Sequence, residues 1–331
     1  MEQIKKLLAL INRPAFCAEN GRITALNPAA RALALSEETD LWEVLADGRD
    51  AYTEFSGGCL SLELTLPGGT VLAEVTLLDR GHLFTLEPES AEADTRMLSL
   101  AAQVLREPLA DVMALAESLP EDTANRSELT RGLYRLLRVL GNMTPPPAFR
   151  PEMVELNALL RELWDSAQPA CEAMGIRFVF TPSPAPVYTA ADGAMLTRAI
   201  HNLLSNSMKF SPGRELRLEL VRSGSVCRIR FWDEGAELPP DPFTRYLREP
   251  GLEDPRSGLG MGLKLVRDAA RAHRGTVLMT AQKEGGLLTE LRLPIRQDTP
   301  LRSPRLRISY TGEYSPLLVE LSDVLPPEFY K

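Results

Sequence analysis

The sequence predicts a multidomain α+β protein made of a small α+β module, a two-helix hairpin and a larger α/β-sandwich domain. The chain has 331 residues, which is long enough for two or three domains with separate cores. The apolar pattern also changes along the chain, from short alternating runs to long helical periods and then to a mixture of both. We therefore place domains at residues 1–90, 91–145 and 151–295, followed by a tail at residues 296–331.

Strand-like runs separated by turn residues dominate the first domain. Residues 15–26 indicate two strands joined at Asn20-Gly21, residues 27–35 are helical, and alternating runs follow between residues 60 and 87. The segment AENGRITALNPAARAL at residues 18–33 resembles the point where PAS domains pass from their first hairpin into a helix. The resemblance implies a PAS-like α+β sensor module.

The second domain is expected to be an antiparallel helical hairpin, because two helical stretches flank the polar break LPEDTANRS. One face of the second stretch carries a row of leucines: Leu129, Leu133, Leu136, Leu137 and Leu140. A hairpin covers only one side of itself, so we expect residues 94–143 to form a dimeric four-helix bundle with a second copy. The alternative is that the hairpin packs on its own chain.

The third domain follows the proline-rich linker TPPPAFRP, which cannot continue a helix. Helical and alternating segments mix between residues 152 and 295. This mixture predicts helices on one face of a mixed, largely antiparallel sheet.

A polar stripe lies on one predicted helix of this domain, in the segment HNLLSNSMKFSP. Asn202, Asn206 and Lys209 are spaced to share one helical face. Amide oxygens can coordinate a magnesium ion that bridges phosphates, and a lysine offers positive charge to the same anion. Such a stripe is by itself more typical of a solvated helix face.

Two further segments have the chemistry of a ligand site. In WDEG, Asp233 ends a predicted strand, where a carboxylate can accept a hydrogen bond from an adenine amino group. In SGLGMGLKLVRD, glycines at 258, 260 and 262 precede a helix. Glycines allow the backbone to approach a triphosphate, and a helix start favours negative charge.

In this order, the three segments resemble the N box and the two glycine boxes of the histidine kinase, Hsp90-like and gyrase-like ATPases. The resemblance implies an ATP–Mg²⁺ site with Asn206 as the magnesium ligand, Asn202 and Lys209 at the phosphates, and Asp233 at adenine. It implies that the pocket is lined by Gly235, Gly258, Gly260 and Gly262, that Phe243 and Tyr246 stand at the F box, and that residues 239–257 form a lid. Glu237 replaces the second glycine of the first box, which we expect to weaken ATP binding.

The same family carries a phosphoacceptor box reading roughly Ser-His-Glu-Leu-Arg-Thr-Pro-Leu, where this chain has AAQVLREPL at residues 101–109. Gln103 then stands at the acceptor position, Val104 at the acidic position and Glu107 at the threonine position. A carboxamide is barely nucleophilic, and valine can neither accept a proton nor orient a nucleophile. The chain has three histidines, His82, His201 and His273, and we assign each a structural role.

The resulting hypothesis is a two-component-type signalling protein that binds ATP–Mg²⁺, forms a homodimer and lacks a catalytic acceptor. Its output would be conformational, toward a response regulator or another signalling protein. One rival is an active kinase or ATPase whose acceptor is Asp111, Ser99 or a histidine on a partner. The other is a dimeric scaffold that binds no nucleotide.

Composition narrows the remaining classes. The formal net charge of −8 argues against nucleic acid as a partner. No apolar run approaches the roughly 18 residues of a membrane helix, so we expect a cytoplasmic protein. Beyond residue 296, RLRISY and SPLLVELSDVLPPEFY read as two extended pieces that would form a hairpin or a docking tail.

Overall fold

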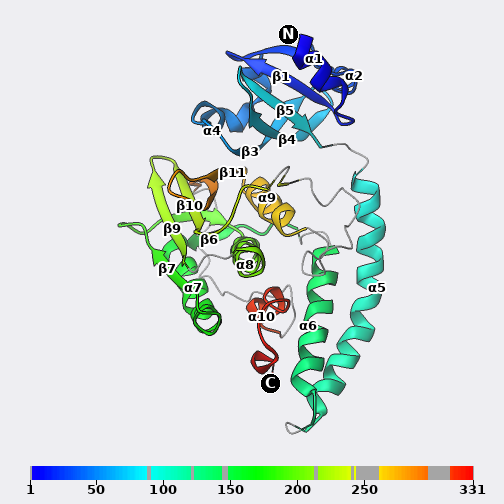
Figure 1. Ribbon diagram of the computed structural model, residues 1–331, viewed down its shortest axis with the longest axis vertical. Coiled ribbons are helices and arrows are strands. Elements are labelled where there is room, and N and C mark those ends of the chain that lie inside the picture. Colours follow the sequence, from blue (N-terminus) through cyan, green and yellow to red (C-terminus); the bar gives the residue numbers. More distant parts are fainter. Residues whose placement is uncertain are drawn as a thin grey trace.

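A computed structural model describes residues 2–87, 91–120, 123–143, 148–211, 215–239, 242–243, 261–296 and 314–330. Its parts are arranged as three bodies in Figure 1: an N-terminal α+β module, a central α/β domain, and a long helical hairpin along one side. Within the described ranges, no helix combines the length and the apolar character that crossing a membrane would require.

The N-terminal module is a five-stranded antiparallel sheet in the order β2-β1-β5-β4-β3. Its strands are β1 (Ala15–Glu19), β2 (Arg22–Leu26), β3 (Cys59–Leu66), β4 (Gly69–Leu77) and β5 (His82–Leu86). Its helices are α1 (Glu2–Ala9), α2 (Pro28–Ala32), α3 (Leu41–Val44), α4 (Arg49–Thr53) and the 3₁₀ turn η1 (Ala46–Gly48). The strands agree with those expected from alternation, and the stacked rings of Phe16 and Phe84, 4.6 Å apart, lie in the core.

In the central domain, helices α7, α8 and α9 share one core with the sheet. The helices are α7 (Leu156–Ala173), α8 (Gly193–Phe210) and α9 (Gly262–Ala272). The strands are β6 (Glu152–Glu155), β7 (Arg177–Thr181), β8 (Tyr188–Ala191), β9 (Glu215–Ser223), β10 (Val226–Asp233), β11 (Thr276–Ala281) and β12 (Leu287–Pro294). The order is β11-β12-β10-β9-β7 with only the β7–β9 pair parallel, and β6 pairs with β8 separately. This matches the mixed, largely antiparallel sheet expected from the sequence.

The two sheets join into one ten-stranded sheet, because β3 pairs antiparallel with β11. Gly58 makes the approach possible: a Cβ at this position would lie 2.1 Å from the Met279 carbonyl oxygen. Ion pairs reinforce the junction, including Arg271–Glu63 and Arg267–Glu87, both at 2.7 Å. No local pattern in the sequence indicated this junction.

The hairpin consists of α5 (Ala91–Ser118) and α6 (Arg126–Met143), which pack around a small apolar cluster. The predicted leucine row is divided between two environments. Leu133 and Leu140 are buried between the helices, whereas Leu129 and Leu136 are 44% and 52% exposed.

The C-terminal segment lies between α6 and α8 (Figure 1). The prediction of extended structure for residues 315–330 was wrong: they form the helix α10 (Pro316–Glu320) and the 3₁₀ turn η4 (Pro327–Phe329). Ser315 accepts a hydrogen bond from Leu318 N, and Pro316 occupies the first helical position, a pattern that starts helices. RLRISY lies outside the described residues.

Candidate functional site

The face of α8 that carries the two asparagines lies within the central domain, where Asn206 is half-buried. Asn202 is fully buried, and its Nδ2 donates to Arg198 O at 2.9 Å. Its Oδ1 has no hydrogen-bond partner among the described residues. Leaving a buried carboxamide oxygen unpaired costs about 1–3 kcal/mol, so this atom is suited to a ligand that supplies a donor or a cation.

Gly262, the first residue of α9, lies against both asparagines. A Cβ at this position would come within 3.1 Å of Asn202 Oδ1 and 3.5 Å of Asn206 Nδ2. The glycine therefore keeps space open between the start of α9 and the polar face of α8. The structure brings together three residues that the sequence assigned to one site.

Asp233 reaches the same region from β10. Side chains on this strand alternate, with Cys227, Ile229 and Phe231 buried on the helix side, and Asp233 continues this buried series. Its Oδ1 accepts hydrogen bonds from Ser211 Oγ at 2.5 Å and from Gly235 N at 3.2 Å. Ser211 is the C-cap of α8, so Asp233 lies at the end of the helix that carries the asparagines.

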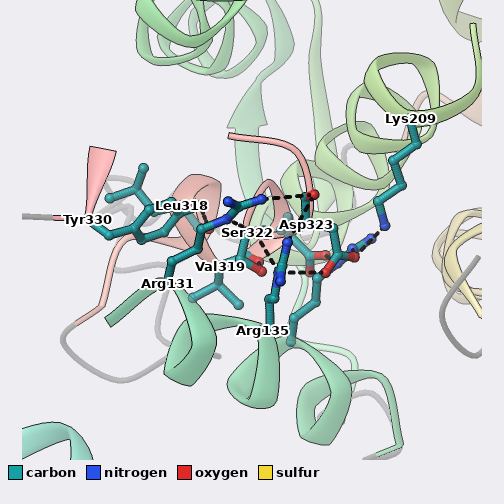
Figure 2. Close-up of polar contacts among 10 residues, drawn as sticks. Arg131, Arg135, Lys209, Leu318, Val319, Ser322, Asp323 and Tyr330 are labelled. Atoms are coloured by element: carbon teal, nitrogen blue, oxygen red, sulfur yellow. Dashed lines mark hydrogen bonds and ion pairs between the residues drawn. The ribbon is translucent and has the colours of Figure 1, made fainter. Parts of the chain in front are cut away.

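Lys209 is held by another part of the chain. Its side chain is 4% exposed, and its Nζ donates to Asp323 Oδ2 in the C-terminal segment at 2.5 Å (Figure 2). Burial lowers the pKa of Lys209, as does nearby Arg138, and Asp323 opposes both effects. The expected phosphate ligand is therefore already paired with a carboxylate.

Of the remaining predicted pocket residues, some lie outside the described part of the chain. Gly258, Gly260, Tyr246 and most of the expected lid belong to this group. Phe243 is fully buried in the core of the central domain, Gly235 is half-buried, and Glu237 is exposed.

The stretch at residues 101–109, which the sequence compares with a phosphoacceptor box, lies on α5. Gln103 and Glu107 are exposed, and Val104 is 73% exposed. Leu109 is buried against α6, as the helical register requires. The side chain at position 103, where the resemblance would place the acceptor histidine, is thus an accessible carboxamide.

The three histidines lie on other elements than α5. His273 is buried, with Nε2 accepting from Asp192 N at 2.9 Å and Nδ1 lying 2.6 Å from Ala269 O. His82 Nδ1 lies 2.8 Å from the Tyr52 hydroxyl. His201 is buried, and burial lowers its pKa to about 4, so it is neutral at pH 7.

Comparison with known proteins identifies sequences that are similar to this chain. Residues 191–297 match the family described as histidine kinase-, DNA gyrase B- and HSP90-like ATPase. The chain is 27% identical over 270 residues to the sensor protein SphS of Synechococcus elongatus, covering 73% of this chain and 62% of that protein. It is 23% identical over 254 residues to the sensor protein KdpD of Clostridium acetobutylicum, covering 68% of this chain and 28% of that protein. This chain is a relative of the bacterial sensor histidine kinases.

The chain spans less than two thirds of the length of either of these sensor histidine kinase relatives. Among solved structures, the full-length ShkA complex with AMPPNP is similar, with a TM-score of 0.51 and 20% identity. The match covers 62% of this chain and 47% of ShkA, and it shows a shared fold.

Sequence reasoning missed three features around the site of this sensor kinase relative. Ser211 follows the lysine of the N box directly, and its bond to Asp233 could have been expected from that position. Gly286 approaches Asp233 so closely that a Cβ would lie 2.4 Å from the Asp233 carbonyl oxygen. Asp323 lies 114 positions after Lys209, and no local pattern indicates their contact.

Proposed function

We propose that this chain is a two-component-type signalling protein that binds ATP–Mg²⁺ but does not phosphorylate itself on histidine. One observation carries the proposal. The unpaired, buried Asn202 Oδ1 lies beside Asn206 and Gly262, whereas the exposed acceptor position is occupied by Gln103.

The donor set suits a magnesium nucleotide. Among the described residues, no cluster of three or more histidine, cysteine or acidic side chains could hold a metal ion by itself. Magnesium in nucleotide sites usually takes few protein ligands and completes its shell with phosphates and water. Asn206 would supply an oxygen ligand, Asn202 would lie at the phosphates, and the ion would neutralise phosphate charge.

The adenine end would be held by Asp233. Its Oδ1 is already fixed by Ser211 and Gly235, which orients the carboxylate. Its Oδ2 makes no hydrogen bond to any of the described residues and can accept one from an exocyclic amino group. Lys209 would contact the phosphates once it is released from Asp323.

The hairpin is proposed to pair with a second copy. Its outer surface exposes large apolar side chains: Val104, Leu105, Val112, Leu115, Leu129, Leu136 and Val139. Exposed apolar residues gathered on one element are typical of interaction surfaces. A dimeric four-helix bundle formed by residues 94–143 would cover them, and sedimentation of the full chain measures the stoichiometry.

In the same proposal, residues 1–90 form a PAS-like sensor, residues 91–145 a degenerate phosphoacceptor domain, and residues 151–295 the ATP-binding domain. A response regulator or another signalling protein is the proposed downstream partner, in the cytoplasm. The junction of β3 with β11 supports a direct route from the sensor to the nucleotide domain.

One rival, an active kinase with another acceptor, has a specific observation in its favour. Asp111 is exposed on α5 and is spaced at helical intervals from Gln103 and Glu107, so it shares their face. Ser99 lies in α5, but its side chain lies outside the described part of the structure. The second rival, a scaffold that binds no nucleotide, does not explain why the buried Asn202 Oδ1 lacks a hydrogen-bond partner.

The test combines binding with phosphorylation. Titration calorimetry of the full chain with ATP and Mg²⁺ should show binding that Asn206→Ala weakens on the order of 100-fold, at least as much as losing an outer-shell partner of a metal site. The matched control is Asn12→Ala, at an exposed position in the N-terminal module. Labelled ATP should leave no acid-labile label on the protein.

Each outcome separates the rivals. Acid-labile label would contradict the pseudokinase assignment. Acid-stable label lost in Asp111→Asn or Ser99→Ala, or steady ATP hydrolysis, would favour the active rival. Absence of binding with or without Mg²⁺ would favour the scaffold.

A further inference from the structure

The C-terminal segment is bound by a row of arginines on α6. Arg131, Arg135 and Arg138 lie on one face of the helix, at successive helical spacings. Arg131 Nε and Arg135 Nε each donate to Ser322 O at 3.1 Å, as Figure 2 shows. The end of the chain is thereby fixed to the hairpin by its backbone as well as by its charges.

Asp323 is the point where this segment meets the nucleotide helix. Its carboxylate contacts Arg138 and Lys209, and lies 3.6 Å from Arg135 (Figure 2). Burial alone would raise the pKa of Asp323, but Arg138 and Lys209 outweigh it and hold the pKa below its ordinary value. Asp323 is therefore ionised and serves as a shared counter-ion for α6 and α8.

Glu320 makes a second connection one turn earlier. Its carboxylate is 1% exposed and receives Arg138 Nε at 3.1 Å and Arg198 Nε at 3.2 Å. Arg198 also donates to Asn142 Oδ1 on α6 at 3.0 Å. Two acidic residues of one short segment thus connect the hairpin with α8.

We propose that residues 314–330 act as an intramolecular latch, in which Asp323 occupies Lys209 as the anion that a nucleotide phosphate would otherwise supply. Docking of the segment and binding of ATP then oppose each other. The inference rests on the proposed function in one respect, namely that Lys209 contacts phosphate.

Competition follows from the environment of Lys209. A lysine that is 4% exposed and close to Arg138 needs an anion to remain charged. Asp323 supplies this anion in the structure described here. A phosphate group that takes its place leaves Asp323 with the α6 arginines alone and removes one of the two connections to α8.

Linkage makes the latch reciprocal. If the docked segment weakens nucleotide binding, nucleotide must weaken docking by the same factor. A purely structural anchor for the C-terminus would lack this property. The aromatic contact between Tyr330 and Tyr134, with centroids 5.1 Å apart, would hold the chain end in either case.

The experiment measures the affinity of the full chain for Mg–ATP by titration calorimetry, in the wild type, Asp323→Asn and Glu328→Gln. Glu328 is an exposed acid on the same segment, and it has no ion pair among the described residues, so its substitution controls for the change in net charge. Asp323→Asn should bind Mg–ATP at least about fivefold more tightly, the lower end of typical coupling. Glu328→Gln should bind like the wild type.

Hydrogen exchange of the wild-type chain provides a second measurement that needs no variant. Backbone amides of residues 316–330 should exchange faster when Mg–ATP is present. Equal affinities for wild type and Asp323→Asn, or unchanged exchange under saturating nucleotide, would overturn the latch and leave the proposed function standing. Failure of the wild type and of both variants to bind Mg–ATP would remove the proposed function, and the latch with it.

Discussion

The helices α8 and α5, to which we assign the nucleotide site and the acceptor position, differ in which of their polar residues are buried. On α8 the polar residues remain and lie in buried surroundings, with Asn202 and Asn206 beside Gly262. On α5 the apolar framework remains, with Leu109 buried, but Gln103 and Val104 face solvent without nucleophile or base. The difference concerns chemistry at exposed positions and leaves the packing intact.

This contrast shows which positions a fold protects. A buried residue such as Leu109 is held by its contacts, because its loss leaves a cavity. An exposed residue such as the one at position 103 is free to change without destabilising the helix. The proposed loss of the acceptor at position 103 would therefore be compatible with a folded hairpin.

Placing a histidine at position 103 tests the contrast between α8 and α5 directly, and it should have the largest effect of the changes considered. Gln103→His combined with Val104→Glu places an imidazole and a carboxylate at the two exposed positions. If the nucleotide side is competent, acid-labile label from ATP should rise from undetectable to measurable. The carboxylate should raise labelling over Gln103→His alone by about 100-fold, the lower range for general acid–base assistance.

Gln103→Asn with Val104→Glu is the matched control, since it supplies the carboxylate without a nucleophile. Filter-binding with acid and base quenches measures the label. A restored variant that binds ATP yet stays unlabelled would mean that the acceptor helix has lost more than its nucleophile.

Truncating the framework of α5 should be more damaging than changing its chemical positions. Leu109→Ala removes a buried side chain that packs in the cluster with Met113 and Leu133, and it should lower the free energy of unfolding by about 3 kcal/mol. Val104→Ala, at a 73% exposed position, should change it by less than about 0.5 kcal/mol. Urea unfolding, monitored by hydrogen exchange of α6 amides, measures the unfolding free energy of both variants. Similar losses in the two variants would contradict the distinction between buried and exposed positions on α5.

Local patterns accounted for much of the site. The spacing of Asn202, Asn206 and Lys209 is a property of a single helix, and Asp233 was expected at the end of a strand, where β10 ends. The contacts that escaped prediction join distant parts of the chain, as Asp323 with Lys209 and β3 with β11 do. The C-terminal LLVEL alternates over too few residues to separate helix from strand, and the Ser315-Pro316 helix start was the better signal.

Buried His201 on α8 should make the free energy of unfolding depend on pH. Burial lowers the pKa of His201 to about 4 in the folded chain, against 6.5 when it is exposed to solvent. Between these values the unfolded chain binds a proton that the folded chain does not, so stability is full above pH 6.5 and falls toward pH 4. Between pH 7 and pH 5 this residue should cost about 2 kcal/mol of unfolding free energy.

His201→Leu removes the titrating group and two ring nitrogens that have no partner among the described residues. Its unfolding free energy, measured by urea at both pH values, should depend less on pH than that of the wild type by this amount. His82 and His273 are present in both chains, so their contributions cancel. Identical pH profiles would show that His201 titrates alike in the folded and unfolded chains, and would contradict the lowered pKa of this buried side chain.

The smallest expected effect comes from narrowing the space between α8 and α9. Gly262→Ala places a Cβ 3.1 Å from Asn202 Oδ1, which should weaken Mg–ATP binding by about 1 kcal/mol, or roughly fivefold, as mild overpacking does. Gly132→Ala in α6 is matched to it, because both glycines lie in helices and a Cβ at Gly132 meets nothing within 4 Å. Replacing glycine by alanine inside a helix should slightly stabilise Gly132→Ala, which meets no close atom, and should leave its nucleotide affinity unchanged, while nucleotide affinity falls in Gly262→Ala. Unchanged affinity in Gly262→Ala would place the nucleotide elsewhere than between the start of α9 and the two asparagines.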